Sequence, residues 1–254
     1  MPPRQPPFIS DKTLSRRSLL EWLGGASVLA LGSPLLAACA STPSAPRDNG
    51  PRDRTAPPGD AAPFGFAPGP NLAPPLDRWG ERTVDPQDLA SIVAGWRLTV
   101  DGMAASRRVL TFQELTSLRR QSQVTDFHCV EGWSVEDVPW DGVALSLLLD
   151  LVKPSPQATH VTIHTVGGRY NDSLPLSVAR EPRTLLAYGI AGSTLPLKHG
   201  FPARVVVPRL LGYKNAKFVE RLELTDHPVN GYWVAAGYPY AGEVPEGRLR
   251  PGKY

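Results

Sequence analysis

The sequence predicts an α+β domain in which strands dominate and the helices are short. Short alternating or β-rich runs recur between residues 96 and 224. The helical patterns between these runs are brief, and strand and helix do not alternate regularly as they do in a parallel sheet built from βαβ units. A mixed sheet with short helices is therefore expected.

The first elements follow one another closely. Residues 96–100 alternate as a strand that is expected to turn at Asp101–Gly102. A short helix follows, with Thr111 as its N-cap and Glu114 three residues later, which is the spacing of a capping box. Residues 143–152 are apolar with helical spacing and predict a second helix.

The second half of the chain predicts three further strands. Residues 160–166 form a β-rich run that ends at two glycines. Residues 204–207 are apolar after their first position and predict a short buried strand. Residues 218–224 alternate, with their polar face directed outward.

Residues 1–38 have the pattern of an export signal. Arg16 and Arg17 precede an apolar stretch, and no charged residue occurs from Trp22 to Ala38. Glycine and proline interrupt this stretch, and it falls short of the roughly 20 apolar residues that a transmembrane helix needs. A twin-arginine signal peptide is predicted.

The apolar stretch ends in Leu36-Ala37-Ala38-Cys39, which resembles a bacterial lipobox. Lipidation of Cys39 would hold the protein at a membrane surface without a spanning helix. The alternative is simple cleavage near this point, which leaves Cys39 free or removes it. A periplasmic or cell-surface protein, attached to the membrane by lipid, is expected.

The mature chain divides into a tether and a domain. Residues 39–88 are rich in proline and bury too little apolar surface to fold alone, although the part with Leu76 and Trp79 could lie over the domain as an extended arm. Residues 89–254 are expected to form the domain. The first 38 residues hold four of the 27 Lys and Arg and two of the 24 Asp and Glu, so 23 against 22 remain. This near-neutral balance does not favour nucleic acid as a partner.

Cys129 lies in the run Asp-Phe-His-Cys-Val-Glu-Gly-Trp, and Cys39 is the other cysteine of the chain. If export uses Cys39, Cys129 is a packing residue, a nucleophile or a soft metal ligand. No known nucleophile signature surrounds it, and on a strand the adjacent His128 would point to the opposite face. The Cys-x-x-Cys spacing of structural zinc sites is absent.

Two basic clusters bracket the strand predicted at 204–207. Lys198, His199 and Arg204 form the first, and Lys214 and Lys217 form the second. Fixed Arg and Lys side chains around glycine turns are typical of sites that hold a phosphate. The alternative is a set of solvated lysines that follows a strand.

Together these motifs resemble the molybdopterin-binding domain of the sulfite oxidase family. The resemblance is carried by Cys-Val-Glu-Gly-Trp at 129–133, Trp-x-Gly-Val at 140–143, Gly-Phe-Pro-Ala-Arg-Val-Val-Val-Pro at 200–208 and Gly-Tyr-Lys-Asn-Ala-Lys at 212–217. It runs from about Leu89 to Tyr238 and is closest to the haem-free bacterial branch, which includes periplasmic methionine-sulfoxide reductase catalytic subunits. It implies a mixed α+β fold around one molybdenum–molybdopterin cofactor.

The resemblance implies a role for each matching residue. Cys129 becomes the thiolate ligand of molybdenum, in keeping with the preference of a sulfur-ligated metal for a soft anionic donor. The other cofactor contacts that it implies are Thr165, His199, Arg204, Gly212, Tyr213, Lys214 and Lys217.

The implied function is an exported molybdenum oxidoreductase that transfers an oxygen atom to or from a small sulfur or nitrogen oxide. Residues 130–133 lack the arginine that animal and plant sulfite oxidases carry after the cysteine, so an arginine cluster for sulfite is not evident. A monomer is expected, with a separate electron-transfer partner such as a membrane haem protein. The competing class is a cofactor-free lipoprotein binding module of the same fold, against which the presence of Cys129, Arg204 and Lys214 together argues.

Overall fold

A computed structural model describes residues 64–80, 93–168 and 170–254 of the chain. These residues belong to one unit, from Asp60 to Tyr254. The predicted signal peptide, Cys39 and the first part of the tether lie outside the described residues. Within the described ranges, no helix is both long and apolar enough to cross a membrane.

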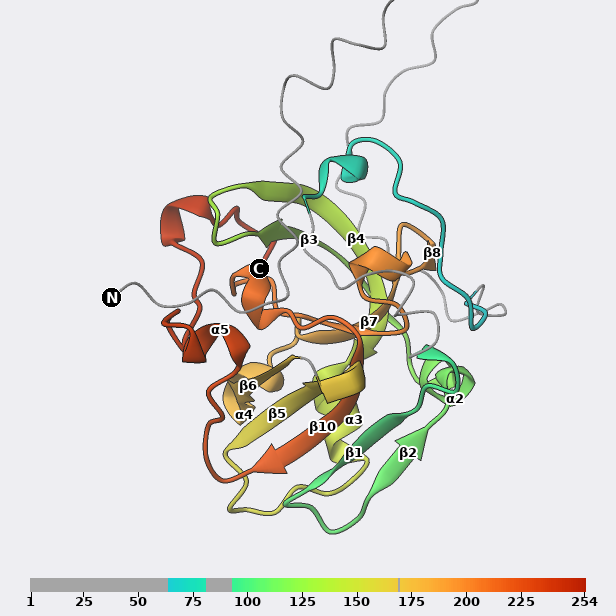
Figure 1. Ribbon diagram of the computed structural model, residues 1–254, viewed down its shortest axis with the longest axis vertical. Coiled ribbons are helices and arrows are strands. Elements are labelled where there is room, and N and C mark those ends of the chain that lie inside the picture. Colours follow the sequence, from blue (N-terminus) through green and yellow to red (C-terminus); the bar gives the residue numbers. More distant parts are fainter. Residues whose placement is uncertain (1–63, 81–92, 169) are drawn as a thin grey trace, which may run out of the picture. The chain divides into compact units, whose positions relative to one another are not determined.

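The domain contains two five-stranded sheets (Figure 1). The first has the order β2-β1-β10-β5-β6, in which β1 and β10 are parallel and the other pairs are antiparallel. Its strands are β1 (Leu98–Gly102), β2 (Arg108–Leu110), β5 (His160–Thr165), β6 (Asn171–Pro175) and β10 (Val219–Thr225).

The second sheet has the order β3-β4-β7-β8, with β9 also paired to β7, and all its pairs are antiparallel. Its strands are β3 (Gln121–His128), β4 (Ser134–Ala144), β7 (Leu185–Ile190), β8 (Ser193–Thr194) and β9 (Arg204–Val206). Mixed pairing in one sheet and antiparallel pairing in the other confirm the predicted α+β class.

All described helices are short. The α-helices are α2 (Phe112–Ser117), α3 (Leu145–Asp150), α4 (Leu176–Ala179) and α5 (Tyr232–Ala235). The 3-10 helices are η1 (Leu76–Arg78), η2 (Val166–Gly168), η3 (Leu197–His199), η4 (Gly212–Lys214) and η5 (Glu246–Arg248).

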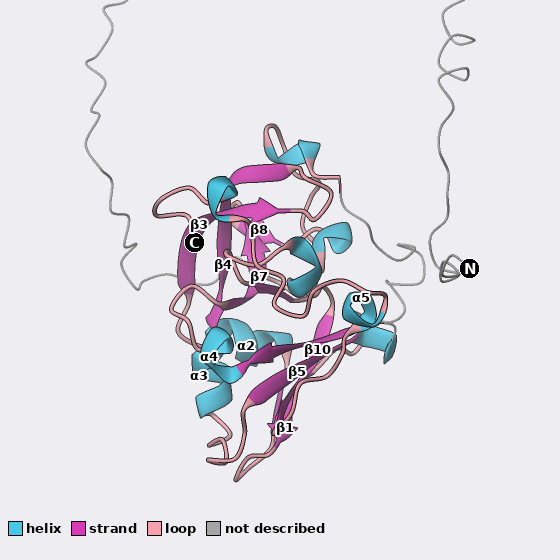
Figure 2. Cartoon of the chain, turned by 90° about the vertical axis from the view of Figure 1, so that its left-hand side faces the viewer, coloured by secondary structure: helices cyan, strands magenta, loops and turns pink. Residues whose placement is uncertain are grey.

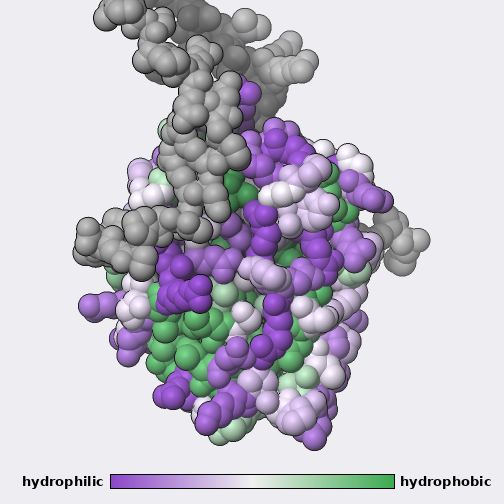
Figure 3. Space-filling model, turned by 180° about the vertical axis from the view of Figure 1, so that it is seen from behind, coloured by the Kyte–Doolittle hydropathy of each residue, from purple (hydrophilic) through white to green (hydrophobic). Residues whose placement is uncertain are grey.

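Three of the α-helices lie together: Figure 2 shows α2, α3 and α4 gathered on one side of the first sheet. Figure 3 shows apolar side chains grouped on the lower part of the face seen from behind.

The predicted helix after Thr111 is confirmed, together with its capping box. The Thr111 hydroxyl accepts a hydrogen bond from the Glu114 amide at 3.1 Å, and the Glu114 carboxylate accepts one from the Thr111 amide at 2.7 Å. The turn expected at Asp101–Gly102 is wrong. Both residues belong to β1, because they pair with Glu223 and Leu224 of the parallel strand β10.

The helix predicted over 143–152 begins later than expected. Val143 and Ala144 end strand β4, where they pair with Leu186 and Leu185 of β7, and the helix starts at Leu145. Apolar residues that continue from a buried strand into a helix give no periodicity at the junction, so the sequence does not mark this boundary.

Residues 64–80 pack against the domain. The Gly69 amide donates to the Leu195 carbonyl at 3.0 Å, and the Thr194 hydroxyl donates to the Ala67 carbonyl at 2.8 Å. At the end of this segment the Trp79 side chain is only 5% exposed. This segment therefore contributes a ring to the core beside the candidate site.

Candidate cofactor site

Cys129 is the first residue after β3 and opens a tight turn that leads into β4. Its amide donates to the Trp133 carbonyl at 2.9 Å, and its carbonyl accepts from the Gly132 amide at 3.2 Å. Gly132 has a φ of 97°, which glycine adopts without a steric penalty. The turn presents a half-buried thiol at the end of a strand, where the strand's pairing fixes the backbone.

The Cys129 thiol lies beside a carboxylate. Its Sγ is 3.9 Å from Oε2 of Glu131, and the same oxygen accepts a hydrogen bond from Nε1 of Trp133 at 3.1 Å. Burial raises the pKa of the Cys129 thiol, and the charge of Glu131 raises it further. A raised pKa is the opposite of what an activated nucleophile needs, whereas a bound metal deprotonates a thiol by itself.

Arg204, the first residue of β9, is a buried cation inside an aromatic cluster. Its guanidinium carbon lies 5.5 Å from the ring centroid of Trp79, 5.3 Å from that of Phe127 and 5.2 Å from that of Trp140. The residue is 2% exposed. Burial lowers the pKa of Arg204 to about 9, so the side chain remains a cation at neutral pH.

This buried cation is incompletely satisfied. Its terminal nitrogens donate to the carbonyls of His199 and Asn215, both at 3.2 Å, but its Nε has no partner among the described residues. Nδ1 of the buried His199 is likewise without a partner in the described part of the chain. Burial, aided by the charge of Arg204, lowers the pKa of His199 to about 3, so its imidazole is neutral.

The Arg204 donor that is unpaired among the described residues fits an anionic group. No carboxylate in the described ranges forms an ion pair with Arg204, and a buried donor without a partner calls for a ligand, water or ion. The phosphate and polar edge of a molybdopterin would supply acceptors of this kind. Among the described residues no group of three or more His, Cys, Asp or Glu side chains could hold a metal ion.

Phe127 connects Cys129 to this cluster. Phe127 precedes Cys129 by two positions, and its ring lies 4.6 Å from that of Trp79 and 6.0 Å from that of Trp133. A Cβ added to Gly212 would lie only 2.5 Å from the Phe127 ring, so this close approach requires glycine. The structure therefore brings Cys129, His199, Arg204 and Gly212 to one region.

Three other predicted residues gather around Tyr170 and Asp172. The Thr165 hydroxyl donates to the Tyr170 carbonyl at 2.8 Å, and the Tyr170 hydroxyl donates to the Tyr213 carbonyl. The Lys214 ammonium forms a buried ion pair with Asp172 at 2.6 Å and donates to the Ser173 carbonyl at 2.9 Å. Helix η4 links these residues to the aromatic cluster around Arg204. Its first residue, Gly212, contacts Phe127, and its last residue, Lys214, contacts Asp172.

The last predicted contact, Lys217, lies beside Gly200. Its Nζ donates to the Lys198 carbonyl at 3.0 Å. Gly200 has a φ of 109°, and a Cβ there would lie 3.0 Å from the side chain of Lys217 and 3.2 Å from that of Arg204. Lys217 and Arg204 therefore flank the same glycine.

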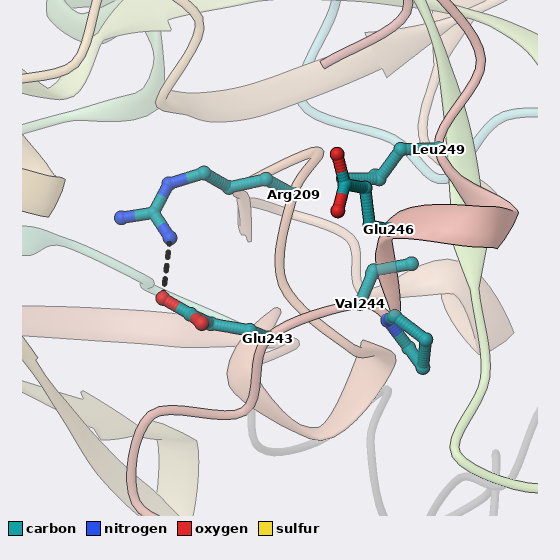
Figure 4. A pocket seen from close by; sticks show the side chains of 6 residues that line it. Arg209, Glu243, Val244, Glu246 and Leu249 are labelled. Carbon is teal, nitrogen blue, oxygen red and sulfur yellow. Dashed lines mark hydrogen bonds and ion pairs between the residues drawn. The ribbon is translucent and has the colours of Figure 1, made fainter.

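Two pockets of the domain are lined by neither Cys129 nor Arg204. A pocket of about 360 Å³ is lined by Arg209, Glu243, Val244, Pro245, Glu246 and Leu249, none of which is a predicted site residue. Figure 4 shows Arg209 directed at Glu243 there, at a distance of 3.3 Å. A smaller pocket of about 130 Å³ includes Lys214 and Tyr240.

Several residues of the site were not predicted as cofactor contacts. Phe127 and Trp140 lie within or beside motifs that the sequence displays, but aromatic residues at such positions are more often core. Trp79 lies in the arm, where nothing in the sequence shows which surface it contacts. Nothing in the sequence near Asp172 indicates a role in the site, because its ion pair with Lys214 forms only in the folded chain.

Comparisons with known proteins identify the family to which the chain is similar. The profile of the family described as "Oxidoreductase molybdopterin binding domain" matches residues 85–233. The chain is 36% identical over 149 residues to the putative protein-methionine-sulfoxide reductase subunit YedZ1 of Azospira oryzae, covering 59% of this chain and 56% of that protein. It is also 36% identical over 155 residues to the protein-methionine-sulfoxide reductase catalytic subunit MsrP of Gluconobacter oxydans, covering 54% and 49%.

Two further matches extend the comparison. The uncharacterized oxidoreductase YuiH of Bacillus subtilis is 32% identical over 148 residues, covering 58% of this chain and 74% of that protein. The crystal structure of the sulfane dehydrogenase SoxCD from Paracoccus pantotrophus superposes with a TM-score of 0.51 at 24% identity, covering 59% of this chain and 41% of that chain, which shows a shared fold. The chain thus spans about half the length of the two methionine-sulfoxide reductase relatives.

Proposed function

Because the chain belongs to the oxidoreductase molybdopterin-binding family, we propose that it is an exported molybdenum enzyme that reduces a sulfoxide. The relatives named as methionine-sulfoxide reductase subunits support this direction of reaction. The observation that carries the proposal is the buried Arg204 cation, without a carboxylate partner among the described residues, in the aromatic cluster that Phe127 links to Cys129.

The cofactor would be held from two sides. Cys129 would provide the thiolate ligand of molybdenum, because a coordinated thiol is held in its deprotonated form. Arg204 and His199 would donate to acceptors of the pterin. We assign the remaining contacts to Thr165, Gly212, Tyr213, Lys214 and Lys217, which lie around η4 and Gly200.

The bound cofactor would supply two-electron exchange between Mo(VI) and Mo(IV). The overall reaction balances when the sulfoxide gains two electrons and two protons and leaves as a thioether and water. The chain's own part is to orient the cofactor and to keep the region around Arg204 dry. Buried Trp79 and Trp140 serve the second purpose, because both are at most 5% exposed.

The protein would be attached to a membrane and would receive electrons from a separate protein. Lipidation of Cys39 after twin-arginine export would attach the protein to a membrane surface on the outer side. Electrons would come from a separate protein, for which a membrane haem protein is the expected class. The enzyme would act as a monomer on a small-molecule substrate or an exposed sulfoxide side chain.

A dye-linked assay tests the reaction. The natively exported protein is supplied with a reduced dye and with a sulfoxide or an N-oxide, and the oxidation of sulfite is followed in parallel with an electron acceptor. Dye oxidation that requires the sulfoxide, and that is lost in Cys129→Ser, is the expected result. Sulfite oxidation without sulfoxide reduction would contradict the proposed direction.

A further inference from the structure

The turn that carries Cys129 is held from outside by the C-terminal segment. Two hydrogen bonds close the turn, and their acceptors are the carbonyls of Cys129 and Trp133. Arg248, the last residue of η5, reaches both acceptors. Its Nη1 donates to the Cys129 carbonyl at 3.1 Å, and its Nη2 donates to the Trp133 carbonyl at 2.8 Å.

Each of the two carbonyls therefore accepts one bond from the turn and one from Arg248. A carbonyl oxygen has two lone pairs, so the guanidinium adds to the turn's own bonds without competing for them. Nη2 of Arg248 also donates to the Ser134 hydroxyl at 3.0 Å, at the first residue of β4. Across the described ranges no carboxylate forms an ion pair with Arg248, so its charge is directed at the turn.

The segment that carries Arg248 is anchored independently of it. Nε of Arg250 donates to Oδ2 of Asp126 in β3 at 2.6 Å, and the Asp126 side chain is 2% exposed. Nζ of Lys253 lies 2.6 Å from a carboxylate oxygen of Asp137 in β4. Strands β3 and β4 are the two strands that the turn joins, so the segment spans the base of the turn.

We propose that Arg248 is a positioning residue that fixes the backbone of the Cys129 turn and thereby the direction in which the thiol is presented. The guanidinium suits this role because its planar fork donates to two acceptors at once, whereas an ammonium is a single point of charge. The part of this inference that concerns a metal-bound thiolate rests on the proposed function. The part that concerns the turn does not.

Amide hydrogen exchange on the full-length, metal-free chain tests the backbone part. In Arg248→Gln the amides of Cys129 and Gly132 should exchange about tenfold faster, because hydrogen bonds to a charged donor that hold the closed turn are lost. Amides of β10 should be unchanged. Unchanged exchange in the turn, or equal acceleration in β10, would overturn the proposal.

Arg183→Gln is a matched control. Arg183 also links the C-terminal segment to β3 through two backbone carbonyls, donating to Gly252 at 2.6 Å and to Val124 at 2.8 Å, but it does not contact the turn. The turn amides of this variant should exchange at the parental rate. If they accelerate as much as in Arg248→Gln, anchoring of the segment rather than Arg248 sets the turn.

The molybdenum-loaded protein gives a second readout. At equal molybdenum content, the visible absorption of the thiolate–metal bond should be altered in Arg248→Gln, and Arg248→Lys should restore it in part. An unaltered spectrum would overturn the role of Arg248 in presenting the thiolate. A parent protein that takes up no molybdenum would instead refute the proposed function. The hydrogen-exchange result would then decide alone whether Arg248 fixes the backbone of the Cys129 turn.

Discussion

The ring centroid of Phe127 lies 5.3 Å from the guanidinium carbon of Arg204. This contact joins β3, which ends one residue before Cys129, to β9, which begins with Arg204, although the two strands are distant in sequence. It also defines the wall of the site, because the same ring lies against Gly212. Phe127, two residues before Cys129, thus contacts both the buried cation and the glycine of η4.

Replacement of Arg204 separates a ligand-binding role from a structural one. In Arg204→Met the metal-free chain should keep its free energy of unfolding to within about 1.5 kcal/mol, because the lost contacts are offset by the removal of a buried cation that lacks a carboxylate partner among the described residues. Cofactor content should fall sharply. Denaturant unfolding and metal analysis measure the two effects.

Arg180→Met is the control for this variant. Arg180, which directly follows α4, forms an exposed pair with Asp150 of α3 at 2.7 Å, and neither helix contains a predicted contact. Its cofactor content should equal that of the parent. Full cofactor content in Arg204→Met would show that the buried cation does not hold the cofactor.

His199 should make the metal-free chain less stable in acid. Its pKa is lowered from 6.5 to about 3 in the folded state by burial. The unfolded chain therefore takes up a proton first as the pH falls, so stability is complete above about pH 6.5 and is lost towards pH 3. Between about pH 7.5 and pH 5 this group alone should cost about 2 kcal/mol.

His199→Gln isolates this contribution, because glutamine does not titrate. Urea unfolding of parent and variant at both pH values gives the comparison. The pKa of His128 is lowered as well, chiefly by burial, and its share remains in both proteins. An equal pH dependence in parent and variant would contradict the burial of a neutral His199.

The Lys214–Asp172 pair should be a strong stability determinant. Both side chains are at most 2% exposed, and burial raises the pKa of Asp172 while it lowers that of Lys214. Asp172→Asn leaves the Lys214 cation without its counter-ion and should lower the free energy of unfolding by about 3–5 kcal/mol. Chemical unfolding measures the loss.

Two further variants make this prediction specific. Asp172→Asn combined with Lys214→Met should recover much of the loss, because the uncompensated cation is gone. Asp150→Asn, which breaks the exposed Arg180 pair, should change the free energy of unfolding by less than about 1 kcal/mol. Similar losses in the buried and exposed pairs would be inconsistent with this account.

Lipid attachment at Cys39 is a separate prediction. Cells fed a labelled fatty acid should yield labelled protein, and Cys39→Ala should abolish the label and release the protein from membranes. Replacement of Arg16 and Arg17 by lysine should block export. Labelling that persists in Cys39→Ala would refute the anchor.

The sequence predicted elements whose signals are local. The β-rich run at 160–166 became β5, the alternating run at 218–224 became β10, and Thr111 with Glu114 formed the expected cap. These features depend on side-chain alternation or on neighbouring backbone groups. Strand β1 was misjudged, because its last residues are held by parallel pairing with β10, a partner far along the chain.

The candidate site, too, was predicted from the sequence only in part. The motifs identified Cys129 and Arg204, and the fold joined them to His199 and Gly212 through Phe127. The aromatic cluster could not be predicted, because Trp79, Phe127 and Trp140 come from three separate segments. Nor does the sequence indicate that Asp172 engages Lys214 or that Arg248 binds the Cys129 turn.

Metal analysis of protein purified after native export, with molybdate supplied, measures directly whether Cys129 holds molybdenum. The account predicts about one molybdenum per chain in the parent, because one thiolate ligand is available. Cys129→Ser should fold with the parental unfolding transition but carry almost no molybdenum. A parent without molybdenum, or a Cys129→Ser variant that retains it fully, would contradict the account.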